Sequence, residues 1–342
     1  MTKNNGARRV HLVGSIPLQD AREVFRAASE ELGALAPRLP DGETGDRSAW
    51  LHFQQSILNE TPNLQKTGSY DLKGHLMPTY GVASAGSPLS FGPLRYADEA
   101  KASYEIFSQM KAAGQIPPAT RFQVCLPTPV AVMCAFIDGP SQAQVESAYQ
   151  KRLLQEVMQI AAHIPPEELA IQWDVAYEVY INAGWKGNRY RAASKEEMLR
   201  KLVPLGNAIP AEAHLGFHLC YGDLGHEHFI EPDDLGLCVR ITNMLAENLS
   251  RPLHWIHMPV PRDRDDDKYF APLRDLRVGT ETQLYLGIIH LTDGIGGYRK
   301  RFNAAKRFCS SFGIGTECGF GRRPPETVRE LLKLHALTAQ DE

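Results

Sequence analysis

His218 and Cys220 stand two positions apart in the apolar run LGFHLC, and they have the clearest chemical potential in the chain. Side chains at positions i and i+2 of a β-strand point to the same face, so this imidazole and thiol can enter one pocket. Both groups are preferred zinc ligands, and a catalytic zinc site needs about three protein ligands and an open position. Cys318, in GTECGFGRR, is the third candidate. The competing interpretation is buried cysteines and a hydrogen-bonded core histidine.

Two further histidines follow apolar runs. His257 ends LHWIH, and His290 ends LYLGIIH. A histidine in such a position is often structural, but at the mouth of a pocket it could donate a proton or act as a fourth metal ligand. The HEH motif from His226 to His228 lies in a loop rich in glycine and acidic residues, so we interpret it as solvated.

Three residues that bind cations or polar groups also stand at the ends of apolar runs or in a glycine-rich segment. Asp174 ends AIQWD, Ser15 ends the first apolar run, and Glu43 lies in LPDGETGDR. Carboxylates in a pocket could hold a substrate ammonium group or orient a histidine. The alternative is that they cap helices or pair with arginines.

The elements that must position these residues form an alternating pattern. Short runs rich in Val, Ile, Leu and Phe alternate with longer segments of helical spacing, up to eight times. This alternation is typical of a parallel sheet with crossover helices, and it predicts an α/β fold, the (β/α)₈ or TIM barrel, as one domain over residues 1–342. The carboxyl ends of its strands meet on one face, where active sites of this fold lie. The predicted strands are Arg9–Ile16, Arg121–Leu126, Leu169–Asp174, Leu215–Cys220, Leu253–Met258, Leu284–His290 and Phe312–Thr316, and the predicted helices are Gln19–Leu32, Pro140–His163, Lys195–Asn207, Asp233–Asn248, Tyr298–Phe308 and Pro325–Leu337.

One segment gives no clear element. The stretch between Pro37 and Pro78 is broken by glycine and proline. Neither the spacing of a helix nor the alternation of a strand can therefore be followed through it. A further strand of the barrel is expected there without defined bounds.

Composition excludes several classes of function. With 43% hydrophobic residues, 23% charged residues and a net charge of -3, the chain offers no electrostatic basis for binding nucleic acid or an anionic membrane. The polar start, Met1–Arg9, and the absence of long apolar runs predict a cytoplasmic protein with no signal peptide or membrane span. Six cysteines in 342 residues are too sparse for a disulfide scaffold and are expected to be thiols. The oligomeric state stays open, a homo-oligomer included.

The order of these motifs resembles the catalytic half of cobalamin-independent methionine synthase. The superfamily of that barrel also contains uroporphyrinogen decarboxylase and zinc-dependent alkyl-thiol transferases. The motifs are short, but they follow one another in the family's order along nearly the whole chain. HLVGSIP is similar to the family's Gly-Ser-Phe-Pro turn, DGETGDR to its His-Gly-Glu loop, PTPVAV to Gly-Pro-Val-Thr, IQWD to Ile-Gln-x-Asp, HLCYGD to His-x-Cys-Tyr-Ser, IIHLTDG to Asp-Ile-His-Ser-Pro, and GTECGFGRR to Asn-Pro-Asp-Cys-Gly-Leu-x-x-Arg.

The resemblance implies a role for each matched residue. It implies that zinc is the cofactor, that Ser15, Glu43 and Asp174 line the pocket of a thiol substrate, and that His290 handles a proton. Asp174 and His290 are thus the implied catalytic residues. The implied zinc ligands are His218, Cys220 and Cys318.

Two departures from the family pattern bear on these implications. The family has a glutamate as its fourth zinc ligand on the strand after His-x-Cys, and this chain has His257 there. Either His257 is a ligand, or three ligands remain, or the metal is lost. The aromatic residue that binds folate in the family is also not evident in AVMCAF, so methyltetrahydrofolate is not assigned as the donor.

The sequence therefore supports a main hypothesis and two alternatives. The main hypothesis is a methyltransferase or other alkyltransferase that uses zinc to transfer an alkyl group from a small donor to a small-molecule thiol. The first alternative is a metal-independent acid–base enzyme of the same superfamily, such as a decarboxylase, lyase or cyclase acting on a small organic acid. The second is a barrel that binds a ligand without catalysis. An anionic thiol would shift importance to an arginine such as Arg47, Arg322 or Arg323.

Overall fold

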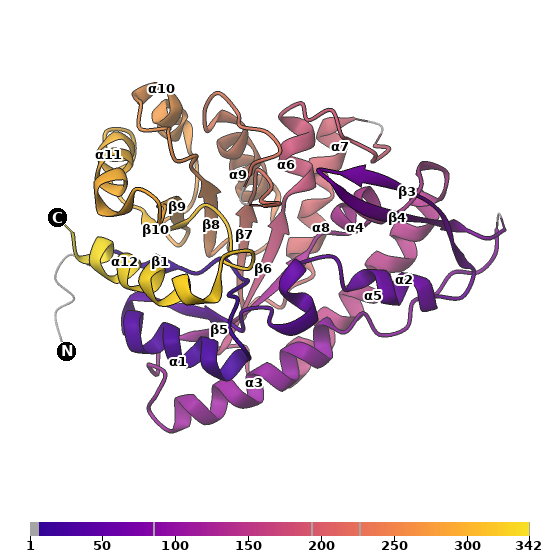
Figure 1. Ribbon diagram of the computed structural model, residues 1–342, viewed down its shortest axis with the longest axis horizontal. Coiled ribbons are helices and arrows are strands. Elements are labelled where there is room, and N and C mark those ends of the chain that lie inside the picture. The colour runs from indigo at the N-terminus through magenta and orange to yellow at the C-terminus, as the bar shows by residue number, and fades with distance from the viewer. Residues whose placement is uncertain (1–6, 85, 193, 226, 342) are drawn as a thin grey trace.

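Eight parallel strands form a nearly closed barrel surrounded by helices (Figure 1), as the sequence predicts. The computed structural model describes residues 7–84, 86–192, 194–225 and 227–341. The sheet order is β1-β10-β9-β8-β7-β6-β5-β2, and just beyond the two outer strands the N–H of Ile16 donates to the carbonyl of Gly42 over 2.8 Å. The barrel strands are β1 (Val10–His11), β2 (Arg38–Pro40), β5 (Arg121–Pro127), β6 (Leu169–Val175), β7 (His214–Leu219), β8 (Trp255–Pro259), β9 (Gln283–Ile289) and β10 (Gly313–Thr316).

All seven predicted strands have a counterpart, but the first is much shorter than Arg9–Ile16. β1 ends at His11, where its pairing with β10 also ends. The amide of Gln123 donates to the carbonyls of Leu12 and Val13, over 3.0 and 3.1 Å. The Gln123 side chain thus takes the place of backbone hydrogen bonds between strands, at the point where the chain turns toward the barrel mouth.

Helices cover the outside of the barrel, so the strands are buried on both faces and read as continuous apolar runs. The predicted helix Lys195–Asn207 is divided after Arg200. Pro204 lacks the N–H that would bond to the carbonyl of Arg200, so the ladder is interrupted there. The α-helices are α1 (Ala21–Leu32), α2 (Gln54–Glu60), α3 (Tyr96–Ala112), α4 (Pro129–Phe136), α5 (Gln142–His163), α6 (Tyr177–Asn182), α7 (Lys195–Arg200), α8 (Leu202–Asn207), α9 (Gly236–Asn248), α10 (Asp267–Phe270), α11 (Gly294–Lys306) and α12 (Val328–Gln340).

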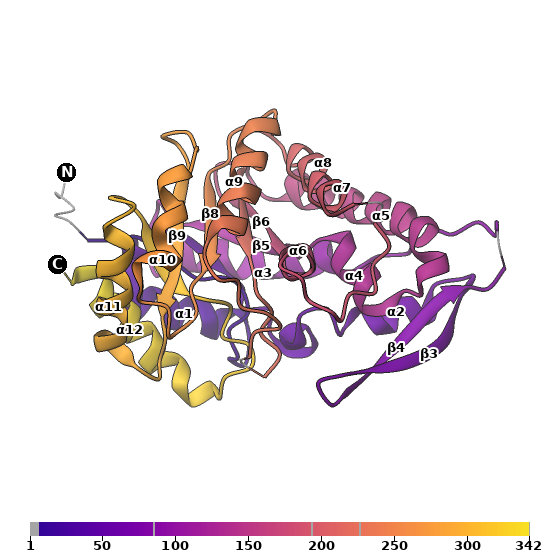
Figure 2. The same ribbon diagram turned by 90° about the horizontal axis from the view of Figure 1, so that it is seen from above.

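An antiparallel hairpin stands apart from the barrel sheet, beside α2 and α4 (Figures 1 and 2). It comprises β3 (Leu64–Leu72) and β4 (His75–Val82), joined by Lys73 and Gly74, which both have positive φ, at 50° and 83°. Two such residues are typical of the tight turns that fit the twist of a hairpin. The hairpin occupies part of the segment between Pro37 and Pro78, where the sequence predicted a barrel strand without defined bounds. That barrel strand is β2, at the start of the segment.

Large side chains fill the barrel toward the amino ends of its strands. The Arg38 guanidinium lies 4.1 Å from the centre of the Trp255 ring, and Nε2 of His11 lies 2.9 Å from Oε1 of Gln172. These four residues are at most 3% exposed. This packing fills the barrel interior on the side of the amino ends of the strands.

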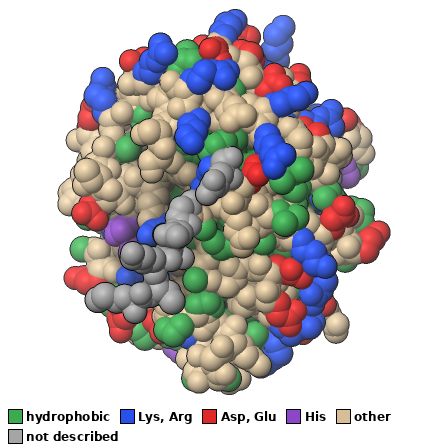
Figure 3. All heavy atoms as spheres, turned by 90° about the vertical axis from the view of Figure 1, so that its left-hand side faces the viewer, with side chains coloured by type: hydrophobic (Ala, Val, Ile, Leu, Met, Phe, Trp, Pro, Cys, Tyr) green, Lys and Arg blue, Asp and Glu red, His purple; other side chains and the backbone are tan. Residues whose placement is uncertain are grey.

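The face that Figure 3 shows carries side chains of both charges. Acidic and basic side chains are interspersed there rather than gathered by sign. Within the described ranges, no helix is both long enough and apolar enough to cross a membrane.

Candidate metal centre

Strand register brings Asp174, His218 and His257 side by side. Asp174 on β6 is paired with His218 on β7, and His218 is paired with His257 on β8. Because paired residues of a parallel sheet point to the same face, all three side chains enter the barrel. They are at most 7% exposed.

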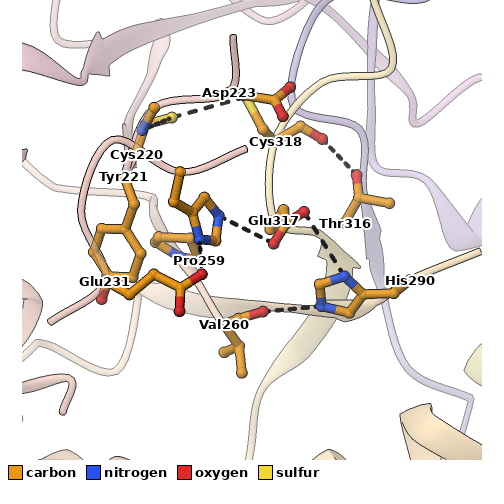
Figure 4. Close-up of polar contacts among 12 residues, drawn as sticks. Cys220, Tyr221, Asp223, Glu231, Pro259, Val260, His290, Thr316, Glu317 and Cys318 are labelled. Atoms are coloured by element: carbon orange, nitrogen blue, oxygen red, sulfur yellow. Dashed lines mark hydrogen bonds and ion pairs between the residues drawn. The ribbon is translucent and has the colours of Figure 1, made fainter. Parts of the chain in front are cut away.

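Cys220 and Cys318 meet next to His218, although they lie 98 positions apart in the chain. Their sulfurs are 3.8 Å apart (Figure 4), and the ligand atoms of the three residues all lie within 4.8 Å of one another. That separation is far too long for a disulfide, but it matches the ~3.8 Å expected for two thiolates on one tetrahedral zinc. The hydrogen bond from Cys318 lowers the pKa of Cys220, and the same bond raises the pKa of Cys318.

The two ring nitrogens of His218 differ in their hydrogen-bond partners, and this difference fits a metal ligand. Nδ1 lies 2.7 Å from Nδ1 of His257, whereas Nε2 is buried without a hydrogen-bond partner. A metal-bound histidine usually donates its other N–H to a neighbour, which fixes its tautomer and ring orientation. If His218 donates through Nδ1, its Nε2 lone pair is free for zinc, so the residues present fit the ion.

His257 lies beside His218 and is not part of the group of three formed by the described residues. Its side chain is fully buried, and burial lowers its pKa. The structure thus brings His257 to the ring of His218, and its role as a fourth ligand stays a prediction.

The variant His257→Ala tests that role. If His257 accepts a hydrogen bond from His218, the variant should still bind one zinc per chain, with affinity lowered about 10- to 100-fold, the usual effect of losing such a partner. Chelator competition measures the affinity. His254→Ala, which removes a histidine stacked on His214 at 4.0 Å, is the matched control. Complete loss of zinc from His257→Ala alone would instead make His257 a ligand.

A cavity of about 310 Å³ opens above the three candidate ligands. Six of the eight candidate catalytic, substrate-binding and metal-binding residues line it: Ser15, Glu43, Asp174, His218, Cys220 and Cys318. His257 and His290 are not among the lining residues.

Two carboxyl groups in this cavity are poorly solvated. Burial raises the pKa of Glu43 to about 7, and burial together with Glu43 raises the pKa of Asp174. The amide of Gln172 donates to Oδ1 of Asp174 over 2.8 Å and fixes its orientation. A cation entering the cavity would favour the ionised form of both groups.

The loop that carries Glu43 also carries Trp50, and both have positive φ, at 48° and 54°. Such backbone is uncommon for residues other than glycine, and it persists only where the surroundings hold it. Arg47 contributes to this by binding Asp41 over 2.9 Å. The result is that an indole and a carboxyl group both face the cavity.

Ser15 and the segment after Cys318 hold each other in place. The N–H groups of Phe320 and Gly321 donate to the carbonyl and the hydroxyl of Ser15, over 2.6 and 3.3 Å. A Cβ at Gly319 would lie 2.4 Å from the Ser15 hydroxyl, so only glycine fits beside Cys318. The end of the first strand thereby positions a ligand from the last.

His290 is not among the residues that line the cavity, and its ring lies beside Glu317, a carboxyl group that the sequence did not single out (Figure 4). Its Nε2 lies 2.9 Å from the carbonyl of Val260, and its Nδ1 lies 3.7 Å from Glu317. Glu317 also pairs with Nε2 of His228 over 3.1 Å. The one feature of the sequence that pointed to Glu317 was its position next to Cys318.

The interpretation of the HEH motif as solvated is wrong for His228. Its side chain is 9% exposed and lies between Glu317 and Glu231. Burial lowers the pKa of His228, but the two carboxylates outweigh burial and raise it to about 9. His226 lies outside the described residues.

Of the three arginines considered for an anionic substrate, Arg322 lines the cavity. Its Nε donates to Asp223 over 3.1 Å, and its Nη2 lies 3.7 Å from the sulfur of Cys318. Arg322 is thus engaged by groups of the protein itself.

Comparisons with known proteins bear on the fold. No protein-family model matches the chain, and no curated protein matches it either. Among solved structures, a B12-independent methionine synthase from Shewanella sp. W3-18-1, in complex with selenomethionine, has a TM-score of 0.63 at 15% identity, over 97% of this chain and 96% of that one. A Listeria monocytogenes protein assigned to the vitamin-B12-independent methionine synthases has a TM-score of 0.55 at 14% identity, over 94% and 86%. The chain therefore has the barrel fold of the B12-independent methionine synthase structures.

Proposed function

We propose that this chain transfers a methyl or other alkyl group to the sulfur of a small thiol, with zinc held by His218, Cys220 and Cys318. The observation that carries the proposal is the meeting of these three side chains in the lining of one cavity. The shared barrel fold supports it, and the Shewanella protein binds selenomethionine, an amino acid with an alkylated chalcogen.

The donor set suits this chemistry. Zinc in a sulfur-rich site lowers the pKa of a bound thiol and leaves the sulfur nucleophilic. Two cysteines and one histidine would hold the ion, and zinc sites with three protein ligands are the kind that bind a substrate. The thiolate sulfur would attack the alkyl carbon, and the electron pair of the bond from that carbon to the leaving group would depart with the leaving group.

The carboxyl groups of Glu43 and Asp174 would bind the amino group of the thiol substrate. Both line the cavity together with Cys220, and their pKa values are raised by burial, so a nearby ammonium would stabilise their charged forms. This arrangement favours an amino-acid thiol such as homocysteine over an anionic thiol, because Arg322 is already paired with Asp223.

A metal measurement separates this function from the acid–base alternative. The protein as purified should contain about one zinc per chain, and removal of zinc should abolish transfer of a methyl group to homocysteine, followed as methionine by mass spectrometry. A metal-free protein that retains full turnover would contradict the proposal and favour the acid–base enzyme.

His290 is the residue proposed to handle a proton, and it would act from outside the cavity lining. Glu317 lies 3.7 Å from its Nδ1 and could relay a proton. His290→Ala should retain zinc and should slow turnover about 10²-fold with donors whose leaving group must be protonated. An unchanged rate with such a donor would contradict the proposed role of His290 in proton transfer.

A further inference from the structure

Five aromatic side chains form a wall of the cavity, and four of them follow one another in ring contact. Trp50 is nearly parallel to Tyr177, at 15° and 6.4 Å between centroids. Tyr177 lies 4.8 Å from Tyr180, and Tyr180 lies 5.2 Å from Phe229. Phe136 of α4 also lines the cavity. The proposed thiol chemistry uses none of these five rings, so the wall needs its own explanation.

The polar side chains of the cavity favour a cation over an anion, because carboxyl groups outnumber lysine and arginine side chains in the described lining. Three carboxyl groups line it, those of Glu43, Asp174 and Asp223. Within the described part of the lining, Arg322 is the one lysine or arginine, and it binds Asp223. Burial lowers the pKa of His52, so this lining histidine does not balance the carboxyl groups. An anionic donor would find no uncommitted arginine or lysine here.

We propose that the alkyl donor is an onium ion, a small sulfonium or quaternary ammonium compound, whose charged centre rests on the faces of Trp50 and Tyr177. Aromatic faces attract such cations through the ring quadrupole, and aromatic cages are a common way to recognise quaternary ammonium groups. The inference rests on the proposed function and names the class of its second substrate. A cavity of about 310 Å³ is at the small end of ligand sites, which suits a compact donor.

The reaction balances without a further reagent. The thiolate sulfur forms a bond to one alkyl carbon of the onium ion. The bond from that carbon to S⁺ or N⁺ breaks, and its electron pair stays on the departing atom. The products are a thioether and a neutral sulfide or tertiary amine, and the leaving group takes up no proton. This agrees with the position of His290, which does not line the cavity.

A binding measurement tests the aromatic site apart from turnover. Choline and its uncharged carbon isostere, 3,3-dimethylbutan-1-ol, have nearly the same shape, and calorimetry can compare them on the zinc-loaded protein. We expect choline to bind about tenfold more tightly. Equal binding of the two probes would overturn the proposal, because shape alone would then explain the wall.

Variants locate the site. Trp50→Leu should remove most of the preference for choline, and Trp50→Phe, which restores an aromatic face, should retain it. Trp185→Leu is the matched control, because Trp185 packs on Tyr180 at 5.0 Å but does not line the cavity. A loss in Trp185→Leu as large as that in Trp50→Leu, or no difference between Trp50→Leu and Trp50→Phe, would contradict the assignment.

Transfer assays separate this inference from the proposed function. Zinc-loaded protein is given homocysteine with either trimethylsulfonium or methyl iodide, and the Cys318→Ser variant supplies the background rate. Methylation from trimethylsulfonium at least tenfold above background supports the inference. Methylation from methyl iodide alone would retain the proposed function and overturn the onium donor. No methylation above background from either would overturn both.

Discussion

The Cys318→Ser variant is expected to bind zinc at least about a hundredfold more weakly than the parent chain. Serine leaves a neutral hydroxyl where zinc prefers a thiolate, and the site loses one of three protein ligands and one negative charge. Because Cys318 follows the last strand at the barrel mouth, apart from the packed residues near the amino ends, the melting temperature without metal should change by only a few degrees. Chelator competition, and the thiolate-to-metal absorption of the cobalt-substituted protein, measure the loss.

Cys309→Ser is the matched control for this variant. Cys309 is also a partly exposed free thiol, but its sulfur bonds to the carbonyl of Ser311 outside the site. Its zinc affinity should equal that of the parent chain. If Cys318→Ser kept full affinity, or if both variants lost it equally, the three-residue metal centre would be wrong.

Asp174→Asn is expected to lower kcat/KM for homocysteine about 10²-fold. Removing the charged partner of a buried ion pair costs roughly 2–5 kcal/mol, and asparagine keeps the shape of the side chain while losing the charge that would face the substrate ammonium. The same variant should change kcat/KM only a fewfold for 4-mercaptobutyrate, which has the same chain without the amino group. Steady-state kinetics with the two thiols give the comparison.

Glu178→Gln controls for the loss of a buried carboxyl group. Glu178 is fully buried, and burial raises its pKa to about 7, yet it does not line the cavity. This variant should stay within about twofold of the parent for both thiols. Equal losses for the two thiols in Asp174→Asn would contradict amine recognition by Asp174.

The sequence determined those features that depend on neighbours along the chain. Continuous apolar runs marked the barrel strands because strands buried on both faces exclude polar side chains. The two-residue period of a strand predicted that His218 and Cys220 point to the same side. His218 on β7 and Cys220 directly after it do both line the cavity. The hairpin left no such mark. Most of β3 is exposed, so the segment has no alternation between apolar and polar residues.

Only the tertiary structure decided which distant residues meet. Register set His257 against His218, closure of the barrel brought Cys318 to Cys220, and the fold of the loop after β7 placed His228 against Glu317. The aromatic wall likewise combines rings from separate loops and helices. These contacts depend on strand pairing and loop closure between residues far apart in the chain, whereas a local sequence pattern reports only on the element in which it lies.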